Sequence, residues 1–365
     1  MSVDTRHGMP QRTHPRRAEG LDVGHRRVVL RLGRAAVPLR TRTLIVGAVL
    51  ALVAGVLAVV SLGLGAYALT PDAVLRVLAG GGEGLDRTVV MEWRLPRTLA
   101  ALTMGALLAI AGALFQGVTR NPLASPDILG LSNGAFTGML LALVFVSASW
   151  PALTVGAVLG GLATAAVIWS LSLRGGLHGF RLIVVGIGVS AMLASLNTWM
   201  LLQVELETAM FASAWGAGSL SGVTAAPLAG ALACAAPFVA AAALLTPQLR
   251  QLDLGDDLAA ASGARPHVVR ALALLIGVVL VAAATTVAGP VAFIALAAPQ
   301  IARRLTRTPS LPFAVSALVG AALLLGSDIV AQHVLPVSLP VGVVTVSVGG
   351  AYLVLMIALE IRRRA

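Results

Sequence analysis

Charged residues and cysteine are both scarce in this chain of 365 residues. Only 11% of the residues are charged, whereas about 25% is usual in a soluble domain, and 58% are hydrophobic. Lysine is absent, so all 26 basic residues are arginine. The single cysteine, Cys234, excludes an intramolecular disulfide and a cysteine-rich metal site. The composition therefore excludes a soluble globular protein, and we expect no metal or other cofactor.

Aromatic residues are also few, at 4%. A surface that binds nucleic acid usually interleaves basic and aromatic residues, so the net charge of +11 does not indicate such a partner. Ten arginines and three acids lie in residues 1–42, which accounts for +7 of that charge. The sequence predicts that residues 1–40 are a disordered basic tail on the cytoplasmic side of a membrane.

Long apolar runs fill the rest of the chain, and the mean hydropathy is +0.93. A helix needs roughly 20 mostly apolar residues to cross a bilayer. We expect an all-α polytopic membrane protein with about ten transmembrane helices and with both termini in the cytoplasm. The expected spans are 44–69, 95–117, 127–147, 151–172, 182–203, 225–247, 268–288, 291–306, 312–334 and 341–360.

The arginines provide an independent test of this topology, because cytoplasmic loops are enriched in basic residues. Outside the tail, the loops predicted to be cytoplasmic hold twelve arginines and the outer ones hold four. The outer arginines are Arg76, Arg87, Arg94 and Arg97. The bias supports the predicted orientation.

Three segments contain prolines and polar residues that an ordinary membrane span does not tolerate cheaply. They are 94–135, with RLPR and NPLASPDILG; 251–270, with LGDDLAAASG; and 289–305, with GPVAFIALAAPQIARRL, continued by 327–345. Together with the spans, these motifs resemble the FecCD-type permeases, the membrane subunits of ABC importers for ferric siderophores, haem and vitamin B12. The resemblance covers about residues 45–360 and implies the type II importer permease fold for a permease domain over residues 41–365.

The resemblance also implies the partners of the chain. They are an ABC ATPase dimer, an extracytoplasmic substrate-binding protein, membrane lipid, a small-molecule cargo and a second permease copy, either identical or a paralogue. The chain itself has no GxxxxGK[ST] motif, since lysine is absent, so we expect a transport subunit rather than an ATPase.

Two arginines at the start of the second span, Arg94 and Arg97, flank Pro96. They are either interfacial residues that reach the lipid headgroups or, as the resemblance implies, a landing site for acidic residues of the binding protein. The family pattern places a further arginine of this docking face at Gln332, beside His333, and a glutamate at Ser338. These departures predict a docking face with altered charge.

The cytoplasmic loop at about 249–267 carries a dense charge pattern and is either a plain solvated loop or, as the resemblance implies, the contact with the ATPase subunit. Acids followed by an alanine run and a glycine are typical of a short helix with a glycine cap. The predicted coupling residues are Leu254, Gly255, Asp256, Asp257, Ala260 and Gly263.

Prolines and glycines near the spans mark broken helices, which in transporters often line the pathway. The candidate gate or pathway residues are Asn121, Pro122, Gly289, Pro290, Pro299 and Gln300, and core packing is the open alternative for the last four. The family's PHxxR histidine is replaced by Gln300. Asp127 is expected to cap the following helix or to act at the gate.

The predicted function is translocation of a ferric siderophore, with haem or vitamin B12 as alternative cargoes. An ion-coupled secondary transporter and a membrane-embedded enzyme are the rivals from other classes. The first usually needs a carboxylate at the membrane midplane and the second needs converging acids or histidines, and the expected spans contain neither pattern.

Overall fold

The structure is a computed structural model that describes residues 27–32, 35–127, 129–172 and 179–364. It divides into two units, residues 1–44 and 45–365, which are described separately. In the first unit, β1 (Arg27–Leu32) pairs antiparallel with β2 (Ala35–Arg40), and Arg27 lies opposite Arg40. The valines of these strands favour extended backbone. The sequence predicted a disordered tail over residues 1–40 and did not indicate this hairpin, which lies within those residues. Residues 1–26 of the predicted tail lie outside the described residues.

Ten helices in the described residues correspond in order to the ten predicted spans, which confirms the all-α fold class. Their bounds are α1 Thr41–Gly63, α4 Leu95–Thr119, α5 Leu131–Phe145, α6 Trp150–Ser172, α7 Gly179–Leu201, α9 Ala225–Leu252, α11 Pro266–Ala288, α12 Ile294–Thr306, α13 Phe313–Ile329 and α14 Val341–Arg364. Within the described residues, seven helical stretches are long and apolar enough to cross a membrane, and the apolar parts of α5 and α14 are shorter. The chain is a multi-pass membrane protein.

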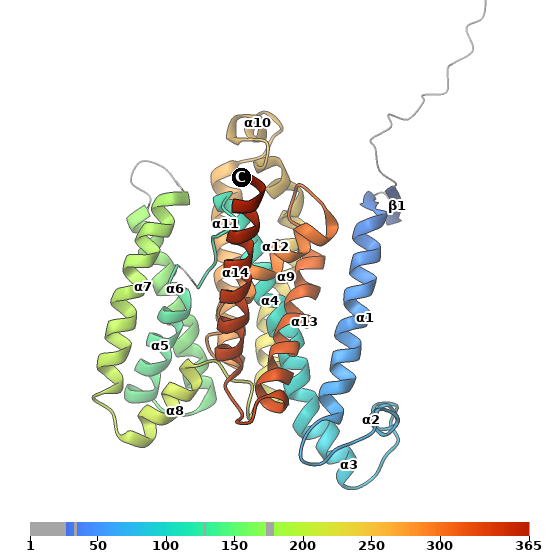
Figure 1. The fold of residues 1–365 in the computed structure, drawn as a ribbon. Coiled ribbons are helices and arrows are strands. Elements are labelled where there is room, and N and C mark those ends of the chain that lie inside the picture. The colour runs from blue at the N-terminus through green and yellow to red at the C-terminus, as the bar shows by residue number, and fades with distance from the viewer. Residues whose placement is uncertain (1–26, 33–34, 128, 173–178, 365) are drawn as a thin grey trace, which may run out of the picture. The chain divides into compact units, whose positions relative to one another are not determined.

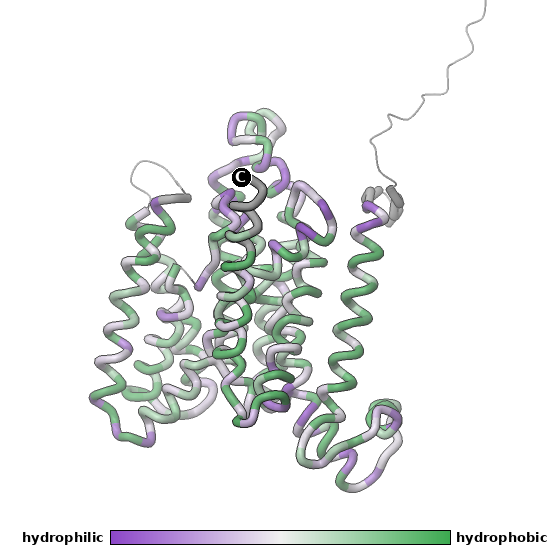
Figure 2. The backbone as a smooth tube through the Cα atoms, in the orientation of Figure 1, coloured by the Kyte–Doolittle hydropathy of each residue, from purple (hydrophilic) through white to green (hydrophobic). Residues whose placement is uncertain are grey.

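Short helices connect these spans. They are α2 Pro71–Leu78, α3 Leu85–Thr88, η1 Val89–Arg94, α8 Leu206–Gly216, α10 Asp256–Ala261 and η2 Val330–Val334. Within residues 45–365, α10 and the C-terminal end of α14 lie at one end of the helices, and α2, α3 and α8 lie at the other (Figure 1). Hydrophobic residues dominate the middles of the helices and hydrophilic ones gather at these ends (Figure 2).

Helix α4 is the centre of the packing, and α11, α12 and α13 pack against it. Glycines allow close contact: a Cβ on Gly112 would overlap the carbonyl oxygen of Ala295, and Gly105 faces Gly320 in the same way. Small residues at helix contacts are what membrane helices use to bring their backbones together. The core therefore depends on close packing of α4 more than on large side chains.

The break predicted near residue 289 lies between α11 and α12. Helix α11 ends at Ala288, and Gly289 has φ +66°, a conformation that glycine adopts without strain. Helix α12 then begins at Ile294 and runs for only 13 residues, with Pro299 inside it. The predicted span 291–306 is therefore a short helix with a non-helical entry.

Candidate functional site

Residues from all three sequence motifs meet around one cavity at the α10 end of the helices. Its volume is about 570 Å³. The walls are the C-terminal end of α4 and the segment after it, the end of α9, one face of α12 and the loop before α13. The lining residues are Gln116, Gly117, Arg120, Asn121, Pro122, Arg250, Asp253, Leu254, Gln300, Arg303, Pro309, Ser310 and Leu311. We call this space the basic cavity.

Cations outnumber acids in the lining of the basic cavity, where Arg120, Arg250 and Arg303 surround Asp253. Burial raises the pKa of the Asp253 carboxyl, and the three arginines oppose that rise. Arg120 is also paired with Asp256 outside the lining, but Asp253 alone cannot neutralise both Arg250 and Arg303. The cavity therefore presents a net positive charge at this end of the chain.

Two glutamines form the inner wall of the basic cavity. The Gln116 amide donates to the Leu296 carbonyl at 3.0 Å, and the Gln300 amide donates to Gln116 Oε1 at 2.5 Å. Gln300 was a predicted gate residue, and the structure joins it to α4. Gln116 was not among the predicted site residues, although a glutamine in an apolar helix was a usable signal.

Asp256, the first residue of α10, is held by two arginines. Arg270 donates to both of its carboxylate oxygens, at 2.7 and 2.9 Å. Arg120 donates to Asp256 Oδ1 at 2.7 Å and to the Leu252 carbonyl at 2.5 Å. The hydrogen bonds and charge of Arg270, helped by Arg120, hold the pKa of Asp256 below its usual range. The short helix α10 is thus tied to both α4 and α11.

The remainder of the 249–267 loop leaves side chains exposed. Leu254 and Leu258 are 65% and 61% exposed, and Asp257 is also exposed. Gly255 precedes α10 with φ +108°, and Gly263 follows it with φ +88°, so both turns use backbone that favours glycine. The sequence pattern does not distinguish Asp256 from Asp257. In the structure the Asp256 carboxylate is bonded to Arg120 and Arg270, whereas Asp257 lies at the surface.

At the opposite end, the three predicted docking residues all make contacts within the chain. Arg97 forms a bidentate pair with Asp328, with Nη2–Oδ1 and Nε–Oδ2 distances of 2.7 and 2.9 Å. Arg94 donates to the carbonyls of Leu62 and Tyr67 at 2.8 and 2.6 Å. The third, Gln332, donates to the Leu339 carbonyl at 3.1 Å. These contacts favour a structural role for each side chain, and the sequence did not indicate Asp328 as the partner of Arg97.

The remaining gate candidates are divided between two places. Asn121 and Pro122 line the basic cavity, and the Asn121 side chain accepts a hydrogen bond from the Leu123 amide at 2.9 Å. Gly289 and Pro290 instead pack against the backbone between α8 and α9, which is the core-packing alternative, and Pro299 is buried inside α12.

Asp127 does not cap the next helix, since α5 begins at Leu131 with Gly130 before it. Its carboxylate accepts a hydrogen bond from the Ser132 hydroxyl at 2.8 Å instead. The cap expectation was wrong because Pro126 and the turn ending at Gly130 delay the start of α5.

Comparisons with known proteins agree with one another. Residues 43–359 match the sequence profile of the FecCD transport family. The chain is similar to the ferric enterobactin transport system permease protein FepG of Escherichia coli, with 46% identity over 82% of this chain and 91% of that protein. It is 35% identical to the probable siderophore transport system permease protein YfhA of Bacillus subtilis, over 84% of this chain and 92% of that one.

A solved structure of a metal-chelate type ABC transporter in an inward-facing conformation superposes with a TM-score of 0.74 at 27% identity. The match covers 86% of this chain and 98% of the other. The similarity therefore extends over nearly all of the helices.

Proposed function

Because the chain belongs to the FecCD transport family, we propose that it is the permease subunit of an ABC importer and that its cargo is a ferric siderophore. The relatives named for ferric enterobactin and for a siderophore support this cargo over haem or vitamin B12. The multi-pass helical fold is the architecture that such a subunit needs. Transport of the cargo is driven by a separate ATPase subunit, since the chain has no phosphate-binding lysine motif of its own.

The observation that carries the mechanism is the anchoring of α10. Leu254, just before the helix, and Asp257 and Leu258 within it are exposed and present an apolar and acidic surface suited to a partner protein. Its inward residue, Asp256, is bonded to Arg120 and Arg270. A force applied to the exposed face therefore reaches α4 and α11 through charge-assisted hydrogen bonds.

The basic cavity adjoins this element, because Asp253 and Leu254, just before α10, line it. Arg120 belongs both to the cavity and to the Asp256 cluster. Gln116, one turn earlier on α4, is bonded to Gln300 on α12. Motion of α10 during the ATPase cycle would shift α4, α11 and α12 together, and these helices form the packed centre of the chain. In this proposal Asn121 and Pro122 move with them at the inner gate.

The α10 end is assigned to the cytoplasm, with both termini on that side. The support is the gathering of arginines there, including Arg250, Arg265 and Arg303, as expected for cytoplasmic loops. The binding protein then docks at the end formed by α2, α3 and α8. Arg94, Arg97 and Gln332 shape that surface through their intrachain bonds, and a second permease copy completes the pathway.

Uptake of different iron complexes tests the cargo. Cells lacking this chain, with and without the restored gene, are supplied with radiolabelled iron as ferric enterobactin, ferric citrate or a ferric hydroxamate, and in parallel with labelled haem and vitamin B12. We expect the restored gene to recover uptake of a ferric siderophore. Recovery of haem or vitamin B12 uptake alone would contradict the proposed cargo.

A further inference from the structure

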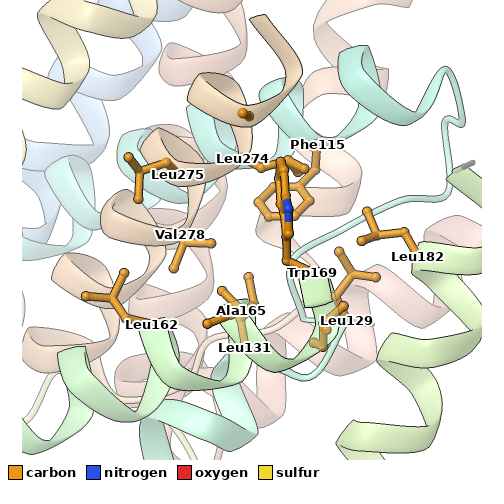
Figure 3. Close-up of a pocket in the computed structure, with 13 residues that line it drawn as sticks. Phe115, Leu129, Leu131, Leu162, Ala165, Trp169, Leu182, Leu274, Leu275 and Val278 are labelled. Atoms are coloured by element: carbon orange, nitrogen blue, oxygen red, sulfur yellow. The ribbon is translucent and has the colours of Figure 1, made fainter. Parts of the chain in front are cut away.

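A second cavity, of about 290 Å³, lies between α4, α6, α7 and α11 and beside the segment that leads into α5. Its walls include Phe115, Leu129, Trp169, Leu182 and Leu274. The close-up shows the Trp169 indole pointing into the space and side chains from the other elements surrounding it (Figure 3). We call this space the apolar cavity.

Water is a poor occupant of the apolar cavity. A buried water needs two to four polar partners, and the lining side chains are all hydrocarbon apart from the indole nitrogen of Trp169. In a protein surrounded by lipid, a hydrocarbon chain fills such a space at lower free energy than either water or vacuum.

The apolar cavity reaches the surface between α6 and α11. Of its lining residues, Ala166 and Leu275 are exposed, the latter by 50%. The surface beside them is apolar as well, with Val167, Leu171 and Leu272 each exposed by 44% or more. A chain that enters from the surrounding lipid therefore meets no polar barrier.

Two arginines and a histidine lie at the α10 end beside this opening. Arg181 directly precedes the lining residue Leu182, is exposed, and makes no hydrogen bond or ion pair within the described part of the chain. Arg265 and His267 are exposed at the start of α11, whose Ala271 lines the cavity. Six residues of helix rise about 9 Å, so Arg265 lies less than two turns from the wall.

The acids near this rim do not cancel its charge. Asp256 is ion-paired with Arg270 and Arg120, and among the described residues Asp257 forms no ion pair with Arg181 or Arg265. Arg181 on α7 is therefore the cation best placed for an anionic group above Leu182. An arginine fork binds phosphate oxygens in two places at once, which suits a phospholipid headgroup.

We propose that the apolar cavity holds one acyl chain of an anionic phospholipid, whose phosphate binds Arg181. This site is independent of the cargo and of the ATPase partner. The lipid would fill the space between α6, α7 and α11 and link these helices to the membrane. The charge at the rim selects an anionic headgroup, and the apolar lining accepts the chain.

Fluorescence quenching in lipid nanodiscs tests the proposal. The full chain is placed in phosphatidylcholine that contains a small fraction of chain-brominated phosphatidylglycerol or, in parallel, chain-brominated phosphatidylcholine. The emission of Trp169 is obtained as the difference between the unchanged chain and Trp169→Phe. The matched control is Trp199, which is 59% exposed on α7, obtained in the same way from Trp199→Phe.

The expected result is several-fold stronger quenching of Trp169 by brominated phosphatidylglycerol than by brominated phosphatidylcholine, with equal quenching of Trp199 by both. Arg181→Gln should remove the preference, and Arg304→Gln, on α12, should leave it. Ala165→Phe, which fills the cavity, should abolish the quenching of Trp169.

Three results would overturn the proposal. They are equal quenching of Trp169 by the two lipids, absence of quenching because the cavity is closed or covered by a second copy, and a preference that survives Arg181→Gln. Circular dichroism of each variant verifies that the helices are retained.

Discussion

A single carboxylate, Asp256, joins three parts of the chain that lie far apart in sequence. Its partners are Arg270, 14 residues later, and Arg120, 136 residues earlier. The sequence indicated the predicted coupling loop and two of its three acids, Asp256 and Asp257, but no spacing rule separates these two or brings Arg120 to either. Those contacts depend on how α4, α9 and α11 pack.

The first prediction separates the two acids. Asp256→Asn should weaken the stimulation of ATP hydrolysis by the binding protein several-fold, because α10 loses its charged anchor to α4 and α11. Asp257→Asn, the matched change on the exposed side, should reduce stimulation much less. ATPase activity of the assembled transporter in nanodiscs measures both. Equal effects of the two changes would contradict the anchoring role.

The second prediction concerns pH. The folded-state pKa of Asp256 lies below its unfolded value of about 3.9, so its contribution to stability is complete above that value and is lost as the pH falls through the folded pKa. The difference in melting temperature between the unchanged chain and Asp256→Asn should therefore stay constant from about pH 8 to pH 5 and shrink only in stronger acid. A difference that disappears near neutral pH would contradict this assignment.

The third prediction concerns the buried pair at the other end. The Asp328 and Arg97 side chains are 4% and 24% exposed, and removing one partner of a buried ion pair costs roughly 3–5 kcal/mol in soluble proteins, less where water reaches the pair. Asp328→Asn should lower the melting temperature, and Arg97→Met combined with Asp328→Leu should recover most of the loss.

The double variant also tests the alternative role of Arg97. A stable double variant that still responds to the binding protein supports the structural role. One that is stable but no longer binds the binding protein would show that Arg97 is a docking residue.

At the scale of elements, the length and hydropathy of the apolar runs were sufficient to predict the helices. All ten predicted spans have a counterpart, and the break before α12 follows from Gly289 and Pro290. The hairpin of β1 and β2 was missed because its arginines and Pro38 resemble the composition of a disordered tail. The start of α5 was placed too early because the turn after Pro126 extends to Gly130.

Close packing of helices gives the fourth prediction. Gly112→Ala should destabilise the chain and lower its yield, because the added Cβ overlaps the backbone of Ala295 and forces α4 away from α12. Gly188→Ala on α7 is the matched control, since no atom lies within 4 Å of its added Cβ and alanine is the better helix former, by up to about 1 kcal/mol. Yield and melting temperature should both fall for Gly112→Ala and both rise for Gly188→Ala. The same change in both variants would contradict the packing account.

At the scale of the whole molecule, the sequence predicted the class of protein and the motifs. It did not predict that residues of the three motifs line the same cavity. Gln116, Arg120, Asp253 and Gln300 come from three motifs and line one cavity. Long-range contacts of this kind follow from tertiary packing, which the motifs do not encode locally. The prediction that Gly289 and Pro290 belong to the pathway finds less support, because both pack against backbone away from that cavity.

The whole-molecule account makes transport depend on a separate ATPase that acts on α10. The most direct test is uptake of radiolabelled ferric siderophore in cells that express this chain and its binding protein, with the cognate ATPase either intact or inactivated at its phosphate-binding lysine. The account predicts that uptake falls to the level of cells lacking the chain when the ATPase is inactive. Uptake that persists without ATP hydrolysis would contradict it and would favour an ion-coupled transporter.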